Sequence, residues 1–246
     1  MSSSIITSIT DNLFKMSKFY HKRFILIILF CVILFYMPIL LNPNLVLERG
    51  NDLQEQFWPI FHFIKVQILV NHQFPLWNNL WFAGMPLLQD PQFSFFYIPN
   101  IIFLLLPIGS AFIITFILHT FLGALGILLI SRKVFNLSET SSLFTALLFI
   151  FSPKLAGFLE AGHPGLIESY GVIPYVILGT LMLAKSKRKI WILLLSISLA
   201  AIFFTHTIIF LISLVACLIL YAICVLPHNI KQFKSFFISL CLTFGF

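Results

Sequence analysis

The stretch FSFFYIPNIIFLLLPIGSAFIITFILHTFLGALGILLI, residues 93–130, decides how this chain is threaded. It is long enough for two membrane crossings, but two prolines interrupt its first half. Residues 110–130 are long and apolar enough to span the hydrocarbon core of a bilayer, whereas residues 93–106 are short for a crossing and contain Asn100. Whether the shorter segment crosses determines the side on which every later loop lies.

The basic residues distinguish the two arrangements, because cytoplasmic loops of membrane proteins carry an excess of lysine and arginine. If residues 93–107 form a re-entrant or interfacial segment with both ends outside, twelve of the fifteen basic residues lie on the cytoplasmic side. If the segment crosses, ten of the fifteen lie outside. We therefore predict that it does not cross, and that crossings follow at about 110–131, 141–153, 169–184, 190–205 and 208–226, with another beginning near 235.

The composition is typical of the same class. Hydrophobic residues make up 60% of the 246 residues and charged residues 9%, with a mean hydropathy of +1.03, which leaves too little polar surface for a soluble fold. We predict an all-α, polytopic transmembrane helical protein with about six or seven spans in this chain. The net charge of +7 is then explained by cytoplasmic loops near anionic lipid, and no nucleic-acid partner is expected.

The two ends of the chain carry different signals. Residues 24–41 follow a basic cluster and lack a small-residue cleavage site, which predicts an uncleaved signal anchor in the cell membrane with a cytoplasmic N-terminus. The chain ends within an apolar run, residues 235–246, so we expect the N-terminal part of a longer protein. We predict a single transmembrane domain over residues 1–246, and we expect its four cysteines to be buried or lipid-facing.

The first outer loop, LVLERGNDLQEQFWPIFHFIKVQILVNHQFPLWNNLWFAGMPLLQDPQ at residues 45–92, concentrates polar chemistry in an apolar chain. It contains four of the eight acidic residues and three of the four tryptophans. Residues 57–70 have apolar side chains at helical spacing, which predicts an amphipathic helix lying flat in the membrane interface. Together with the segment that does not cross, this non-cytoplasmic loop extends over residues 43–109.

Asp52 is the first candidate for catalysis. A carboxylate held at a membrane surface near apolar walls can serve as a general base or bind a divalent cation. Alternatively, Asp52 and Glu55 are solvated acids at the start of the helix over residues 57–70, where negative charge suits the helix dipole. The residues leave both roles open for Asp52, favour the helix role for Glu55, and predict a turn at Asp90, which precedes a proline.

A second outer loop, SPKLAGFLEAGHPGLIESY at residues 152–170, is rich in glycine and proline and carries Lys154, Glu160, His163 and Glu168. A histidine can act as an acid, a base, a metal ligand or, when protonated, a phosphate partner. His206 lies in a turn at the same outer face, as an intramembrane ligand or as a turn residue at headgroup level. A metal site needs three or four ligands, and this loop alone does not supply them.

Common catalytic signatures are absent from the sequence. It contains no HExxH, GxSxG or CxxC motif and no phosphate-binding loop, so zinc proteolysis, serine or thiol hydrolysis and nucleotide binding have no support. The acidic residues fall in predicted loops instead of mid-span positions, which argues against an ion-coupled transporter.

The first outer loop resembles that of bacterial YfhO-like membrane proteins and of the related membrane family labelled 6-pyruvoyl-tetrahydropterin synthase-related. No part of the chain resembles the soluble pterin enzyme of that name. The resemblance covers roughly residues 24–210, and Ala161-Gly162-His163 is similar to the same group. The matching segments of the first loop are Gly50-Asn51-Asp52, Gln56-Phe57-Trp58-Pro59, Pro75-Leu76-Trp77-Asn78, Phe82-Ala83-Gly84-Met85-Pro86-Leu87, Asp90-Pro91-Gln92 and Tyr97-Ile98-Pro99-Asn100.

These families are grouped with the GT-C glycosyltransferases, polytopic enzymes that take a sugar from a polyprenyl-phosphate carrier at the non-cytoplasmic face. The resemblance implies that Asp52 is the base or metal-associated carboxylate, and that Asp90 or Glu160 assists as a second acid. An asparagine precedes Asp52 where a tight pair of acids would indicate a metal, so dependence on a divalent cation stays open. We predict that the substrate, with its lipid phosphate, is bound by Arg49, Glu55, Lys154, His163 and His206.

Other function classes stay open beside this one. The chain could be a polyprenyl-linked glycan or lipid transporter, a membrane protein that binds such carriers without catalysis, or an assembly partner. The expected partners are membrane lipid and a polyprenyl-phosphate-linked sugar. The acceptor, whether glycan, lipid or protein, is not indicated by the sequence.

Overall fold

The computed structural model is mostly helical, in agreement with the predicted all-α class. It describes residues 22–43, 45, 48, 50–79, 81, 83–87, 94–186, 188–224 and 233–244. Arg49 and Asp90, two of the predicted site residues, lie outside this part of the chain. The roles assigned to them therefore stay predictions.

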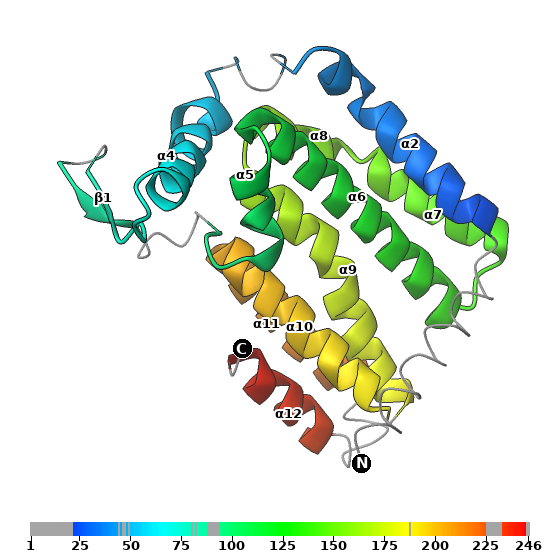
Figure 1. Cartoon of the computed structure of the whole chain (residues 1–246). Coiled ribbons are helices and arrows are strands. Elements are labelled where there is room, and N and C mark those ends of the chain that lie inside the picture. Colours follow the sequence, from blue (N-terminus) through cyan, green and yellow to red (C-terminus); the bar gives the residue numbers. More distant parts are fainter. Residues whose placement is uncertain are drawn as a thin grey trace.

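Long apolar helices dominate the described residues (Figure 1). Five helical stretches are long and apolar enough to cross a membrane, and a slightly shorter apolar helix, α10, accompanies them. The helices of this bundle are α2 (Lys22–Leu41), α6 (Ile108–Lys133), α7 (Glu139–Ile150), α8 (Pro153–Ala161), α9 (Pro164–Lys185), α10 (Lys189–Thr205), α11 (Thr207–Cys224) and α12 (Phe233–Phe244).

Helices α6 and α9 form the centre of the bundle and are much more buried than α2 or α11. They pack closely because glycines face the crossing point. A Cβ atom on Gly171 would lie 2.3 Å from the carbonyl oxygen of His119, and one on Gly123 would lie 3.0 Å from the Cα atom of Gly171. Small residues at a helix crossing let two backbones approach closely, as in helices that associate within bilayers.

The outer helices are apolar on their exposed sides. Helix α11 exposes large hydrophobic side chains along its whole length, and α2 does the same. A helix that is hydrophobic all round is typical either of a deeply buried element or of a membrane span. The exposed large side chains of α11 are Ile208, Leu211, Ile212, Val215, Leu218, Ile219 and Ile223.

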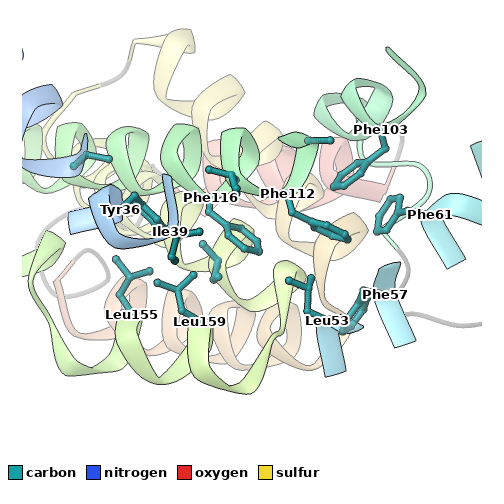
Figure 2. Packing of buried hydrophobic residues seen from close by; sticks show 14 of the residues in the cluster. Tyr36, Ile39, Leu53, Phe57, Phe61, Phe103, Phe112, Phe116, Leu155 and Leu159 are labelled. Carbon is teal, nitrogen blue, oxygen red and sulfur yellow. The ribbon is translucent and has the colours of Figure 1, made fainter. Parts of the chain in front are cut away.

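The predicted helix over residues 57–70 is present as α4 (Trp58–Leu69), and a π-helical turn, η1 (Leu53–Phe57), precedes it. Its apolar side packs against the bundle: Phe61 stacks on Phe103 with ring centroids 4.0 Å apart and meets Phe112 of α6 edge-on. Figure 2 shows these rings in one core with side chains of α2, α6 and α8. After α4, a short antiparallel pair, β1 (Trp77–Asn78) and β2 (Met85–Pro86), projects away from the bundle (Figure 1).

Residues 94–106 do not form a crossing helix. They contain only two single turns, η3 (Ile98–Ile101) and α5 (Ile102–Leu105), before Pro107 precedes α6. The ammonium group of Lys65 in α4 donates a hydrogen bond of 2.6 Å to the carbonyl oxygen of Leu106, which fixes the end of this segment. The segment contains no helix long enough to span a bilayer; that it lies outside the membrane core stays a prediction from the charge distribution. We call residues 94–106 the pre-α6 segment.

The prediction of a loop over residues 152–170 is wrong. The hydroxyl oxygen of Ser152 accepts a hydrogen bond of 3.3 Å from the backbone N–H of Leu155 and so starts α8, which occupies much of this stretch. Helix α9 then begins at Pro164, earlier than the predicted crossing over residues 169–184, because proline suits the first position of a helix. As a consequence Glu168 lies inside a helix, not in a loop.

Candidate functional site

Asp52 and His163 form a hydrogen-bonded pair between the two predicted outer loops. Asp52 precedes η1, and His163 lies between α8 and α9. The Nε2 atom of His163 lies 2.6 Å from Oδ2 of Asp52, so Nε2 carries a hydrogen and donates it to the carboxylate. The Asp52 side chain is 51% exposed and that of His163 is 21% exposed. The pair therefore has one face in the protein and one face open to a ligand.

Gly162 explains why the two chain segments can meet. It ends α8 in the left-handed conformation, with φ of 73°, which non-glycine residues rarely adopt. A Cβ atom on Gly162 would lie 2.6 Å from the backbone nitrogen of Leu53, which is a severe clash. The side-chain amide of Asn51 also donates a bond of 3.3 Å to the carbonyl oxygen of Glu160, and so ties the two segments together.

The inner side of the pair is apolar. Leu53 and Phe57 of η1 are buried, and the Phe57 ring meets the His163 ring edge-on with centroids 5.4 Å apart. The second ring nitrogen of His163, Nδ1, is buried and has no hydrogen-bond partner among the described residues. These apolar side chains keep water from the inner side of the pair, whereas the carboxylate of Asp52 remains half exposed.

Of the two roles that the sequence left open for His206, the structure shows that of a turn residue, and the ligand role stays a prediction. It separates α10 from α11, and its Nδ1 accepts a hydrogen bond of 3.4 Å from the backbone N–H of Ile209, so it is a turn residue that caps a helix. Burial, and then the nearby charge of His163, lower the pKa of His206 below its ordinary value. His206 thus lies within electrostatic range of the pair and favours its own neutral form.

The remaining predicted residues surround the pair at different distances. Glu160, in the last turn of α8, is exposed and shares its backbone contact with Asn51. Glu55 is exposed in the first turn of η1, where negative charge suits the helix dipole. Lys154 lies at the opposite end of α8, about 10 Å of helix rise before the last residue of that helix, with its ammonium group 4.8 Å from the centroid of the Phe158 ring. Lys154 is therefore not brought to the pair.

The capping alternative for Asp52 does not describe its contact. Its side chain makes no capping hydrogen bond to η1 and faces His163 instead. Among the described residues, no group of three or more histidine, cysteine, aspartate or glutamate side chains could hold a metal ion.

An apolar groove lies beside the site, between α2 and α8. It has a volume of about 200 Å³ and Glu160 stands in its lining. Beyond the groove, α2 exposes further large apolar side chains, among them Leu34, Met37, Leu40 and Leu41. Its other lining residues are Phe35, Pro38, Ile39, Leu45, Ala156 and Leu159.

Glu168 is the notable residue that sequence reasoning missed. Its side chain is fully buried in the second turn of α9, beside Asn100 and Ser94 of the pre-α6 segment. The dipeptide His163-Pro164 was the available signal, since proline is common at the first position of a helix. A helix starting there would have placed Glu168 within a span.

Comparison with protein-family models, with characterised proteins and with solved structures finds no match to this chain.

Proposed function

We propose that this chain is a membrane glycosyltransferase of the GT-C type, related to the YfhO-like proteins, which transfers a sugar from a polyprenyl-phosphate donor at the non-cytoplasmic face. The observation that carries the proposal is the Asp52–His163 pair, which joins two segments of the chain beside an apolar groove. The resemblance of the first loop to those families supports the same assignment. In this proposal the chain is a multi-pass protein of the cell membrane with its N-terminus in the cytoplasm.

The proposed reaction uses Asp52 as the general base. Its half-exposed carboxylate accepts the proton of an acceptor hydroxyl, whose oxygen then bonds to the anomeric carbon of the sugar. The bond from that carbon to the lipid phosphate breaks, and the polyprenyl phosphate leaves on the opposite side with the bonding electrons. The hydrogen bond from His163 fixes the direction in which the carboxylate presents its oxygens.

His163 also suits the leaving phosphate. A protonated imidazole stabilises negative charge that develops on a phosphate oxygen, and the apolar surroundings increase this effect. Nδ1 of His163 is buried, so a phosphate would meet the exposed edge of the side chain, which is 21% exposed. The groove between α2 and α8 is mostly apolar, as a polyprenyl chain requires, and its lining includes Glu160, whose carbonyl oxygen is bonded to Asn51 beside the pair. The lipid therefore enters sideways with its phosphate toward His163.

The direct test is sugar transfer by the purified protein with Asp52→Asn. We expect a loss of about 100-fold or more, the usual contribution of a general base, with normal membrane insertion. Glu48→Gln is the matched control, because Glu48 is an exposed acid of the same loop without a role in the site. The readout is transfer of labelled sugar from a polyprenyl-phosphate hexose to membrane glycan or lipid. Retained transfer in Asp52→Asn would contradict the assignment of the base.

One observation favours a second function, a transporter of polyprenyl-linked glycan or lipid. Glu168 is buried within a helix, whereas the sequence placed every acid of the outer face in a loop. Buried ionisable residues in membrane helices often mark transport pathways. The two functions differ in their product: only a transferase releases polyprenyl phosphate from the donor. A transporter moves an intact lipid-linked sugar across vesicles made from lipid and purified protein.

A further inference from the structure

Three acceptor atoms without partners meet inside the bundle. Glu168 is 0% exposed, and neither of its carboxylate oxygens has a hydrogen-bond partner among the described residues. The neighbouring side chain of Asn100 is 6% exposed, and its amide oxygen also lacks a partner in this part of the structure. Buried polar atoms are almost always hydrogen-bonded, so three buried acceptors without a bond in one place indicate a bound ligand.

Asn100 and Ser94 lie within interaction distance of Glu168, but the hydrogen bonds of good geometry that they donate go to other acceptors. The amide nitrogen of Asn100 donates to the carbonyl oxygen of Ser94 at 3.1 Å, and the Ser94 hydroxyl donates to the carbonyl oxygen of Thr205 at 3.0 Å. The Tyr97 hydroxyl lies 2.8 Å from Nε2 of His119. It donates that bond, because the other ring nitrogen faces a backbone carbonyl at 2.7 Å and so carries the ring hydrogen.

Positive charge is also missing from the cluster. Among the described residues, no lysine or arginine forms an ion pair with Glu168. Helix α10 ends at Thr205 with its carbonyl end toward Ser94, and that end of a helix carries partial negative charge. An ionised Glu168 and the end of α10 therefore add to a negative field, which a small cation would neutralise.

We propose that Glu168, Asn100 and Ser94 bind one monovalent alkali cation, such as a sodium ion, inside the bundle. Carboxylate, amide and hydroxyl oxygens are the ligands that hard cations prefer. Interrupted helices of membrane proteins use their carbonyl ends in the same way. One carboxylate balances one positive charge, whereas a divalent ion would leave excess charge in an apolar interior. A proton on Glu168 would provide a single donor and leave the second carboxyl oxygen without a partner.

The cation would join three parts of the fold. Ser94 and Asn100 belong to the pre-α6 segment, and Glu168 belongs to α9. The Ser94 hydroxyl already contacts the end of α10. Gly165 lets α9 approach this point, since a Cβ atom there would lie 2.5 Å from the carbonyl oxygen of Thr205. Binding would therefore hold the pre-α6 segment against the bundle. This inference does not depend on the proposed transferase activity.

The experiment is sodium binding by the full chain in detergent, measured by equilibrium dialysis with radioactive sodium. Thermal unfolding is followed in parallel in sodium chloride and in choline chloride at equal ionic strength. We expect saturable binding of one ion per chain and a higher Tm in sodium, because a ligand that binds only the folded state stabilises it. Glu168→Gln should lose the binding and the Tm difference, while Glu48→Gln, at an exposed loop acid, should keep both.

Asn100→Ala provides a second variant that keeps the carboxylate. It should weaken sodium binding by about 10- to 100-fold, as expected when a ligand or its support is removed. Absence of saturable binding by the unaltered chain would overturn the proposal. So would equal binding in Glu168→Gln, or the infrared band of a protonated carboxylic acid that persists in saturating sodium and disappears in that variant.

Discussion

Asp52 and Glu168 are two carboxylates with opposite surroundings. Asp52 is 51% exposed and has a histidine nitrogen 2.6 Å from its oxygen. Glu168 is fully buried and has no partner for either oxygen among the described residues. An exposed carboxylate with a fixed partner is ready to exchange protons with a substrate. A buried one without a partner must bind an ion or a proton, so it contributes through the stability of the fold.

Gly171→Ala should have the largest effect, because it disrupts the crossing of α6 and α9 at the centre of the bundle that holds both carboxylates. The added Cβ atom would lie 2.3 Å from a backbone oxygen of α6, which cannot move aside easily. We expect a loss of about 3 kcal/mol in the free energy of unfolding. The measurement is thermal unfolding in detergent, with Gly157→Ala as control, since a Cβ atom at Gly157 meets no atom within 4 Å. Equal stability of the two variants would show that the crossing of α6 and α9 is loose.

Gly162→Ala should impair the Asp52 region and leave the Glu168 region intact. Its φ of 73° and the clash with the backbone of Leu53 both oppose a side chain. We expect a cost of about 2 kcal/mol and a loss of sugar transfer larger than the change in Tm would suggest, because the pair is pushed apart. Sodium binding at Glu168 should persist in this variant. Loss of both functions together would mean that the two regions are not independent.

Asp52→Asn should leave the fold nearly unchanged. Ion pairs that are partly exposed contribute little to stability, about 1 kcal/mol or less. Thermal unfolding of this variant should therefore lie close to that of the unaltered chain, while transfer is lost. A large drop in Tm would assign Asp52 a structural role and remove the contrast with Glu168.

The acid dependence of His206 should be the smallest effect. Burial, with the charge of His163, lowers the pKa of His206 in the folded chain. The unfolded chain then binds more protons, so this group's stabilisation is present above about pH 6.5 and is lost as the pH falls below it. His206→Asn keeps an acceptor for the N–H of Ile209 and removes the titration. Its Tm should fall less than that of the unaltered chain between about pH 7.5 and 5.5. An equal fall in both proteins would show that the acid sensitivity does not come from His206.

The sequence was most informative where one physical effect dominates. Uninterrupted apolar runs predicted α2, α6 and α11, and the apolar spacing after Phe57 predicted α4. Charge asymmetry predicted that residues 93–107 do not cross, and the described part of this segment contains two single turns and no spanning helix. Each of these predictions uses only neighbouring residues or a sum over whole loops.

The site depended on contacts that no local pattern contains. Asp52 and His163 are 111 residues apart, and their meeting requires the left-handed Gly162 to approach Leu53. The position of Glu168 was missed because glycine and proline after Ser152 indicated a loop, whereas Pro164 starts a helix. Tertiary packing decided both cases.

The most direct test of the account is a double-mutant cycle of Asp52→Asn and His163→Gln, measured as sugar transfer from a polyprenyl-phosphate hexose. Residues that act as one unit show strongly non-additive losses. If the pair is the catalytic unit, the double variant loses no more activity than Asp52→Asn alone, and all three variants remain folded. Losses that multiply, or transfer that survives in either single variant, would contradict the account.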